Sequence, residues 1–275
     1  MNDVEIEPEG PKPISFMAAA FWTFAVGVVT ALSVSITASA RPGAEVDLVN
    51  LTACYMLAYS GLLFAMLRIY APESRVREVL AMRRASPVAV VLSTLAGAAL
   101  YPAISVMNDA LARRFPRPPE ETELIDQLLQ MTSVRQRVVA VVSFAVLIPL
   151  GEALFFGGAI FGGLRRGRAE GAAVLATAVL FALYPLTPRA IPSQIVLGLL
   201  LLWLRGRSGS LVPVIAANIA FNAAEMLPLA TGMPDFDISP KIALGSALIA
   251  GLLTWGAGML FARDARAERG RLADA

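Results

Sequence analysis

The chain has 275 residues, of which 57% are hydrophobic and only 16% are charged, and its formal net charge is +2. Soluble domains carry roughly 45–50% apolar and about 25% charged residues, so we do not expect a soluble globular enzyme. With one cysteine and no histidine, the chain cannot form an internal disulfide, a zinc site that needs histidine, or a Ser-His-Asp or Cys-His catalytic arrangement. We predict no metal, no cofactor and no nucleic-acid partner.

Eight stretches of the sequence approach the run of about 20 apolar residues that a membrane-crossing helix needs. The first carries no charge over 26 residues and follows acidic residues, which is atypical of a signal peptide, so we predict a retained span. The third is interrupted by Pro102, and the fifth and sixth are short. The predicted spans are residues 15–40, 48–67, 87–108, 138–164, 171–186, 191–204, 211–230 and 241–261.

These spans predict an all-α integral membrane protein with one polytopic domain at residues 15–262, between tails at 1–14 and 263–275. An even number of spans places both tails on one side of the lipid bilayer. The connections on that side carry 15 Lys and Arg residues against 8 on the other, so the positive-inside rule makes both tails cytoplasmic. We predict the inner membrane of a bacterium as the location, and the sequence leaves the oligomeric state open.

The connection between the third and fourth spans, residues 109–137, departs from this charge pattern because it carries five arginines on the less basic side. Its apolar residues recur at the spacing of a short amphipathic helix, which either lies on the membrane surface or forms a solvated loop helix. If the connection is cytoplasmic instead, one of the eight spans is miscounted. The arginines are Arg113, Arg114, Arg117, Arg135 and Arg137, and the apolar residues are Leu124, Ile125, Leu128 and Leu129.

Glu152 lies near the middle of the fourth span, where an ionisable group costs about 2.5–3.5 kcal/mol and indicates a functional site by default. In the seventh span Asn218, Asn222 and Glu225 share one helix face, so their side chains can satisfy a buried carboxyl across a helix interface. The alternative is a hydrogen bond between helices without chemistry, and Glu225 can instead lie at the membrane surface. Further candidates for the same polar pocket are Tyr184, Pro185 and Gln194.

Two features near these residues predict packing rather than chemistry. Gly158 and Gly162 form a GxxxG spacing, which predicts the close approach of another helix. The single cysteine, Cys54, lies in the second span and is interpreted as a small apolar core residue.

Four short motifs follow one another between residues 140 and 224, and their order and spacing resemble those of the CAAX prenyl protease and bacteriocin-processing (CPBP) family. They are GEALFFGG at 151–158, similar to E-E-x-x-F-R-G; FALYPL at 181–186, similar to F-x-x-x-H; RSGSL at 207–211, similar to R-x-G-S-L; and PVIAANIAFN at 213–222, similar to P-x-x-x-x-H-x-x-x-N. The resemblance implies a multi-helix intramembrane endopeptidase. In that family a Glu activates water, histidines and an Asn position the water and stabilise the oxyanion, and an Arg holds the second Glu.

Four of the six family positions are changed in this chain. Glycine offers no carboxylate, phenylalanine cannot pair with a carboxylate, and asparagine cannot accept a proton as histidine does. We therefore expect hydrolysis to be absent or very slow, and we expect bulky phenylalanines to fill the site with apolar surface. The changed positions are Gly151, Phe156, Pro185 and Asn218, and the retained ones are Glu152 and Asn222.

Three functions remain open from the sequence. The first is a catalytically impaired or inactive pseudoprotease that binds a membrane protein or peptide. The second is an active intramembrane endopeptidase, of the CAAX or bacteriocin-processing type, with Glu152 as base and Asn218 and Asn222 as oxyanion donors. The third is a small transporter with Glu152 as its proton site. The family interpretation predicts that Glu152 faces the two asparagines.

Overall fold

The structure is a computed structural model that describes residues 10–129, 131–185, 187–232 and 238–273. Over these residues the chain is helical and contains no strand. The α-helices are α1 Phe16–Ala40, α2 Leu48–Tyr70, α3 Val76–Val79, α4 Pro87–Arg114, α5 Pro119–Leu129, α6 Val134–Ala140, α7 Ile148–Glu152, α8 Phe161–Arg166, α9 Glu170–Leu183, α10 Ile191–Ser208, α11 Val212–Thr231 and α12 Pro240–Ala273.

The all-α, polytopic membrane fold is confirmed, but the number of full spans is smaller than predicted. Six helices of the described chain are long and apolar enough to cross a membrane: α1, α2, α4, the continuous helix from α6 to α8, α11 and α12. The other two predicted spans are α9 and α10. With 14 residues, α9 is only about 21 Å long, and α10 ends in a polar turn with Arg205 and Arg207. These two helices pack against each other as a shorter hairpin.

Two prolines also behave differently from the expectation. Pro102 lies inside α4, which continues through it to Arg114 without a break. Pro185, predicted inside the fifth span, lies in the turn that follows α9, because α9 ends at Leu183. Tyr184 still has helical backbone angles and donates to the Leu180 carbonyl, but Pro185 has no N–H to continue the helical hydrogen bonds, which accounts for the end of α9.

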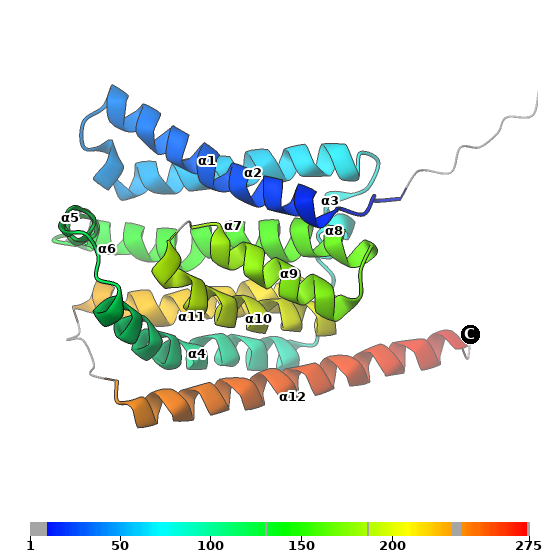
Figure 1. Ribbon diagram of the computed structural model, residues 1–275. Coiled ribbons are helices and arrows are strands. Elements are labelled where there is room, and N and C mark those ends of the chain that lie inside the picture. The colour runs from blue at the N-terminus through cyan, green and yellow to red at the C-terminus, as the bar shows by residue number, and fades with distance from the viewer. Residues whose placement is uncertain (1–9, 130, 186, 233–237, 274–275) are drawn as a thin grey trace, which may run out of the picture.

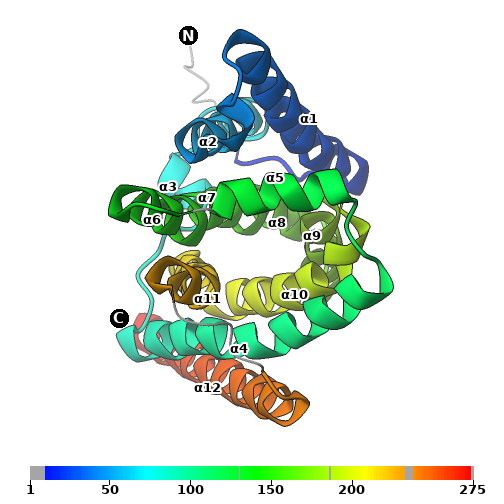
Figure 2. The same ribbon diagram turned by 90° about the vertical axis from the view of Figure 1, so that its left-hand side faces the viewer.

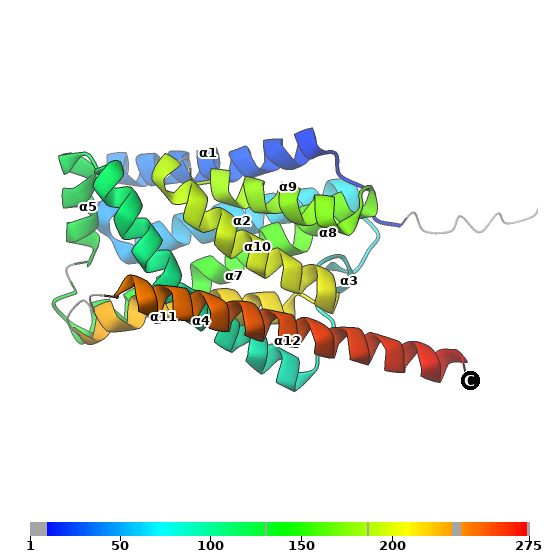
Figure 3. The same cartoon turned by 60° about the horizontal axis from the view of Figure 1, so that its bottom comes forward.

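The helices are arranged in layers around the α6–α8 helix (Figures 1 and 2). One side of it is covered by α1 and α2, and the other by α11 and α10, with α4 and then α12 beyond them. Half of the apolar window in α6–α8 is buried, against 22–33% in the other five spans, so this helix forms the centre of the bundle. Figure 3 shows α12 beside α4 at the outer edge.

The central helix is not regular along its length. Two segments, Val141–Leu147 and Ala153–Ile160, are π-helical and flank α7, which contains Glu152. Pro149 in α7 has no N–H to donate, and a missing donor within a helix frees a carbonyl and favours wider turns. Because π-helical turns occur often at functional sites, this irregularity draws attention to α7.

The two ends of the bundle differ in structure. The described chain begins, and α12 ends, at the same end, which also contains α3 (Figure 1). At the opposite end α5 lies across the tops of the other helices (Figure 2). The predicted helix in the connection between the third and fourth spans is thus present as α5, which lies across the ends of the neighbouring helices.

The RSGSL turn is a structural junction between α10 and the α3–α4 connection. Gly209 ends α10 in the left-handed conformation with φ of 61°, and the Ser210 hydroxyl donates to the Arg83 carbonyl at 2.7 Å. The same connection fills the space beside Gly158, where an added Cβ would lie 2.7 Å from the Leu80 side chain. The GxxxG glycines thus admit the end of the short helix α3, since Gly162 faces the Val79 carbonyl and Gly158 faces the Leu80 side chain.

The outward faces of the outer helices are apolar. Large side chains such as Phe21 and Ile36 on α1 and Leu252 and Trp255 on α12 are more than half exposed. A water-facing surface of this kind would be unfavourable, whereas the acyl chains of a bilayer match it. The lipid bilayer is therefore the environment of this bundle, as predicted.

Candidate functional site

Glu152 lies at the centre of the bundle, at the end of α7, with 9% of its surface exposed. The Tyr184 hydroxyl donates a hydrogen bond to one carboxylate oxygen at 2.7 Å. The Asn218 amide donates to the other at 3.2 Å. The carboxylate therefore connects α7 to the end of α9 and to α11 through two neutral donors.

Asn218 is fully buried, and its side-chain amide donates two hydrogen bonds to the central helix. Besides Glu152, its amide donates to the Pro149 carbonyl at 3.0 Å. Asn222 donates to the Asn218 backbone carbonyl at 2.8 Å and to its side-chain oxygen at 3.2 Å. The structure thus brings all three predicted residues together, with Asn222 one step removed from the carboxylate.

Gly151, at the position of the family's first Glu, is covered by a tyrosine from α2. A Cβ added to Gly151 would lie 2.8 Å from Tyr59 Cδ2, so even alanine requires a shift there. The Tyr59 ring packs 5.9 Å from that of Phe155 and 6.2 Å from that of Tyr184. The space that a second carboxylate would need is therefore occupied by an aromatic ring.

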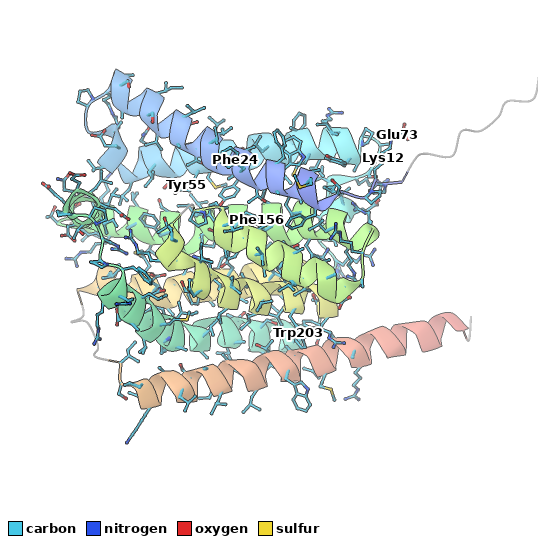
Figure 4. The ribbon with its side chains drawn as sticks, in the orientation of Figure 1. Lys12, Phe24, Tyr55, Glu73, Phe156 and Trp203 are labelled. Atoms are coloured by element: carbon cyan, nitrogen blue, oxygen red, sulfur yellow. The ribbon has the colours of Figure 1, made fainter. Side chains whose placement is uncertain are left out.

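Phe156, at the position of the family's arginine, is 2% exposed and lies in an aromatic cluster. Its ring centroid is 5.2 Å from that of Phe155, 5.3 Å from that of Phe181 and 5.4 Å from that of Tyr184. Figure 4 shows Phe156 within the layer of the central helix and α9, on the side that faces α2 and Tyr55. The expectation that phenylalanines fill the site is confirmed.

The free space beside Glu152 is very small. The cavity that Glu152 and Asn218 line, together with Phe156 and Phe181, has a volume of about 10 Å³. A cavity needs at least about 10–15 Å³ on this measure to hold one water molecule. The site therefore has room for one water at most, and none for a peptide backbone.

The remaining sequence candidates lie apart from the carboxylate. Pro185 and Gln194 line a separate cavity of about 340 Å³ above the α9–α10 turn, and Tyr184 forms part of its wall. Glu225 is exposed on α11. Cys54 is buried in α2, as expected. Among the described residues no three metal-ligating side chains gather into one group.

Two residues that contact the central helix around the site were not predicted from the sequence. Tyr59 lies in α2, far from the motifs, and nothing in its span distinguishes it from other aromatic residues. Arg205 is 4% exposed and donates from Nε to the Gly157 carbonyl at 3.0 Å, within the π-helical segment. A charged residue next to the RSGSL motif was a visible signal, but it was assigned to a connection rather than to the core.

One segment of the chain matches a known family in sequence. Residues 134–224 match the family model described as type II CAAX prenyl endopeptidase Rce1-like. This segment of the chain is thus similar to a type II CAAX prenyl endopeptidase, in agreement with the resemblance inferred from the motifs. No curated protein and no solved structure matches the chain.

Proposed function

We propose that this membrane protein is a pseudoprotease: its Rce1-like domain binds a membrane protein or peptide without hydrolysing it at an enzymatic rate. The observation that carries the proposal is the closed site around Glu152. Its carboxylate is held by Tyr184 and Asn218, and the cavity beside it measures about 10 Å³.

The chemistry of the site supports this proposal. Peptide hydrolysis needs a base for the attacking water and donors for the oxyanion. Proton transfer by a positioned base contributes roughly 10²–10⁴-fold to the rate, and one oxyanion donor contributes roughly 10²–10³-fold. Among the described residues at this site Glu152 is the only base, and the Asn218 amide is already engaged by Pro149 and Glu152.

The packing supports it independently. A substrate has to bring its scissile carbonyl within about 3.5 Å of the attacking water. Tyr59 covers Gly151, and the aromatic cluster around Phe156 closes the side toward α9. Admission of a peptide backbone to Glu152 would require these packed rings to separate.

The proposal of a partner rests on what the domain keeps. The helices form a layered bundle with a hydrogen-bonded network between α7, the end of α9 and α11, although four of the six family positions are replaced. A membrane domain of this kind can still recognise a hydrophobic segment through its lipid-facing helices. We place it in the inner membrane of a bacterium with both termini cytoplasmic, because the end of the bundle where the described chain begins and α12 ends carries the larger share of the Lys and Arg residues.

A residual peptidase activity is the second candidate, and one observation favours it. Glu152, Asn218 and Asn222 form one connected network, as a base with two potential oxyanion donors would. For this function the cavity beside Glu152 has to open and admit both water and substrate.

The two candidates are separated by one reconstitution experiment. The full chain is placed in liposomes with a set of hydrophobic membrane peptides that carry a photo-crosslinking group, and cross-linking and cleavage are measured in the same sample. We expect cross-linked peptide without cleavage. Cleavage that Glu152→Gln abolishes, while Glu225→Gln as the matched control retains it, would establish the peptidase. Cross-linking no greater than to liposomes with an unrelated membrane protein would contradict the partner.

A further inference from the structure

The turn between α9 and α10 is surrounded by cavities that the carboxylate site does not use. Two cavities, of about 340 Å³ and about 470 Å³, share Glu121, Thr187 and Arg189 as lining residues. We call these two together the α5 vestibule, because Glu121 belongs to α5. Tyr184 and Pro188 separate the vestibule from a third cavity, an apolar groove of about 410 Å³ between α1 and α9.

The vestibule carries an excess of positive charge. The Arg189 side chain is only 16% exposed and forms an ion pair with Glu121. Arg117 lines the same cavity. The burial of Arg189 lowers the pKa of its guanidinium, and the positive charge of Arg117 lowers it further. Two guanidinium groups thus face one carboxylate, which leaves one positive charge for an anionic ligand.

A buried acceptor in the vestibule needs a donor. The Gln194 side-chain oxygen is buried and accepts no hydrogen bond from the described part of the chain, and Gln194 lines the smaller vestibule cavity beside Asn108. An unsatisfied buried acceptor costs about 1–3 kcal/mol. A ligand with both an anionic group and an O–H or N–H donor would match this set of groups.

The groove next to the vestibule is suited to an acyl chain. Its wall consists mainly of apolar side chains, among them Phe24, which is 58% exposed, and Leu183, which is 44% exposed. Figure 4 shows Phe24 on α1, the outermost helix on this side of the bundle. Because α1 is a membrane span, the groove opens toward the hydrocarbon of the bilayer, and lipid is the molecule that reaches it there.

We infer that the α5 vestibule and the adjoining groove form a binding site for an anionic phospholipid whose head group carries hydroxyls, of the phosphatidylglycerol type. The phosphate lies between Arg117 and Arg189, and a head-group hydroxyl donates to the Gln194 oxygen after this side chain turns toward the cavity. One acyl chain lies in the groove along Phe24 and Leu183. The position of α5 across this end of the bundle places the head group at the depth of the membrane surface (Figure 2).

The test measures lipid binding to the full chain, purified in detergent and freed of lipid, by calorimetric titration with short-chain phosphatidylglycerol. Phosphatidylcholine of the same chain length tests the head group, and glycerol phosphate tests whether a free phosphate is enough. We expect phosphatidylglycerol to bind about tenfold more tightly than phosphatidylcholine, and glycerol phosphate to bind far more weakly than either lipid, since it lacks the chain.

Charge variants locate the site. Arg117→Gln should weaken phosphatidylglycerol binding about tenfold, whereas Arg84→Gln, an exposed arginine at the other end of the bundle, should leave it unchanged. Glu121→Gln removes the competing carboxylate and should tighten binding, so the two vestibule variants have opposite effects. Thermal melting of each variant verifies that it is folded.

Three results would overturn the inference. One is a phosphatidylglycerol affinity that neither Arg117→Gln nor Glu121→Gln changes. Another is glycerol phosphate that binds as tightly as the lipid, which would make the vestibule a soluble-phosphate site. The third is a hydrophobic peptide with an acidic residue that binds more tightly than the lipid and loses affinity in Arg117→Gln, which would assign the vestibule to a peptide.

Discussion

Replacement of Asn218 by alanine is expected to destabilise the bundle, because this one side chain joins α11 to the central helix. Its amide donates to the Pro149 carbonyl and to the Glu152 carboxylate. Alanine leaves both acceptors in the core without that donor, and the site is too small for a replacement network of water. The substitution therefore tests whether the polar network is a structural element of the fold.

The size of the effect follows from the number of hydrogen bonds. Those between transmembrane helices contribute about 0.6 kcal/mol on average and about 1.7 kcal/mol at most, so the loss of two amounts to about 1–3 kcal/mol. Asn222 provides the matched control, since it is partly buried and its bonds go to Asn218 in the same helix. We expect Asn222→Ala to change the free energy of unfolding by about 0.5 kcal/mol or less.

The assay is reversible unfolding of the purified protein in mixed micelles with increasing denaturing detergent, followed by circular dichroism. A double-mutant cycle between Asn218→Ala and Glu152→Gln isolates the contact between these two residues. If Asn218→Ala destabilises the protein no more than Asn222→Ala does, the network does not hold the helices together and the reasoning fails.

Three further predictions use the same unfolding assay. Gly151→Ala should destabilise the bundle by about 1–3 kcal/mol through overpacking against Tyr59, and Tyr59→Ala in the same chain should cost less than the sum of both changes. Phe156→Ala should cost about 3–5 kcal/mol as a buried aromatic truncation; a loss under 1 kcal/mol would mean that the cluster is loosely packed. Asp47→Ala should cost about 1 kcal/mol, because Asp47 caps the N-terminus of α2. Burial acts to raise the pKa of Asp47, but the backbone N–H groups that it caps and the Arg41 guanidinium lower this pKa overall. The contribution of Asp47 to stability should therefore be present above the unfolded pKa, near 3.8. It should disappear as the pH falls through the lower pKa of the folded state. A stability difference between wild type and Asp47→Ala that stays constant in acid would contradict this assignment.

Hydrophobic runs predicted the positions of the helices well, because both the bilayer and the bundle core require long apolar segments. They predicted less well which helices are long enough to cross the whole bilayer. The sequence does not distinguish a full span from the α9–α10 hairpin, whose length is limited by the turn around Pro185. The two π-helical segments around α7 were also beyond prediction, since they leave no trace in the apolar periodicity.

At the candidate site the order of the motifs predicted the polar residues that lie within residues 134–224. It identified Glu152, Asn218 and Asn222, and it offered Tyr184 as a contributor, which the structure places on the carboxylate. It could not identify Tyr59, because the contact of α2 with Gly151 is a tertiary contact between segments far apart in the chain. The motifs identify polar residues along the sequence, whereas the closure of this site depends on the packing of α2 against the central helix.

The central claim is that the Rce1-like domain of this chain does not hydrolyse peptides. Its most direct test is incubation of the reconstituted protein with membrane peptides in heavy-oxygen water, followed by mass spectrometry of the products. Hydrolysis places a heavy oxygen in each new carboxylate. We expect labelled product no greater than that from the Glu152→Gln variant. Labelled product that accumulates with time in the wild type and not in Glu152→Gln would contradict it.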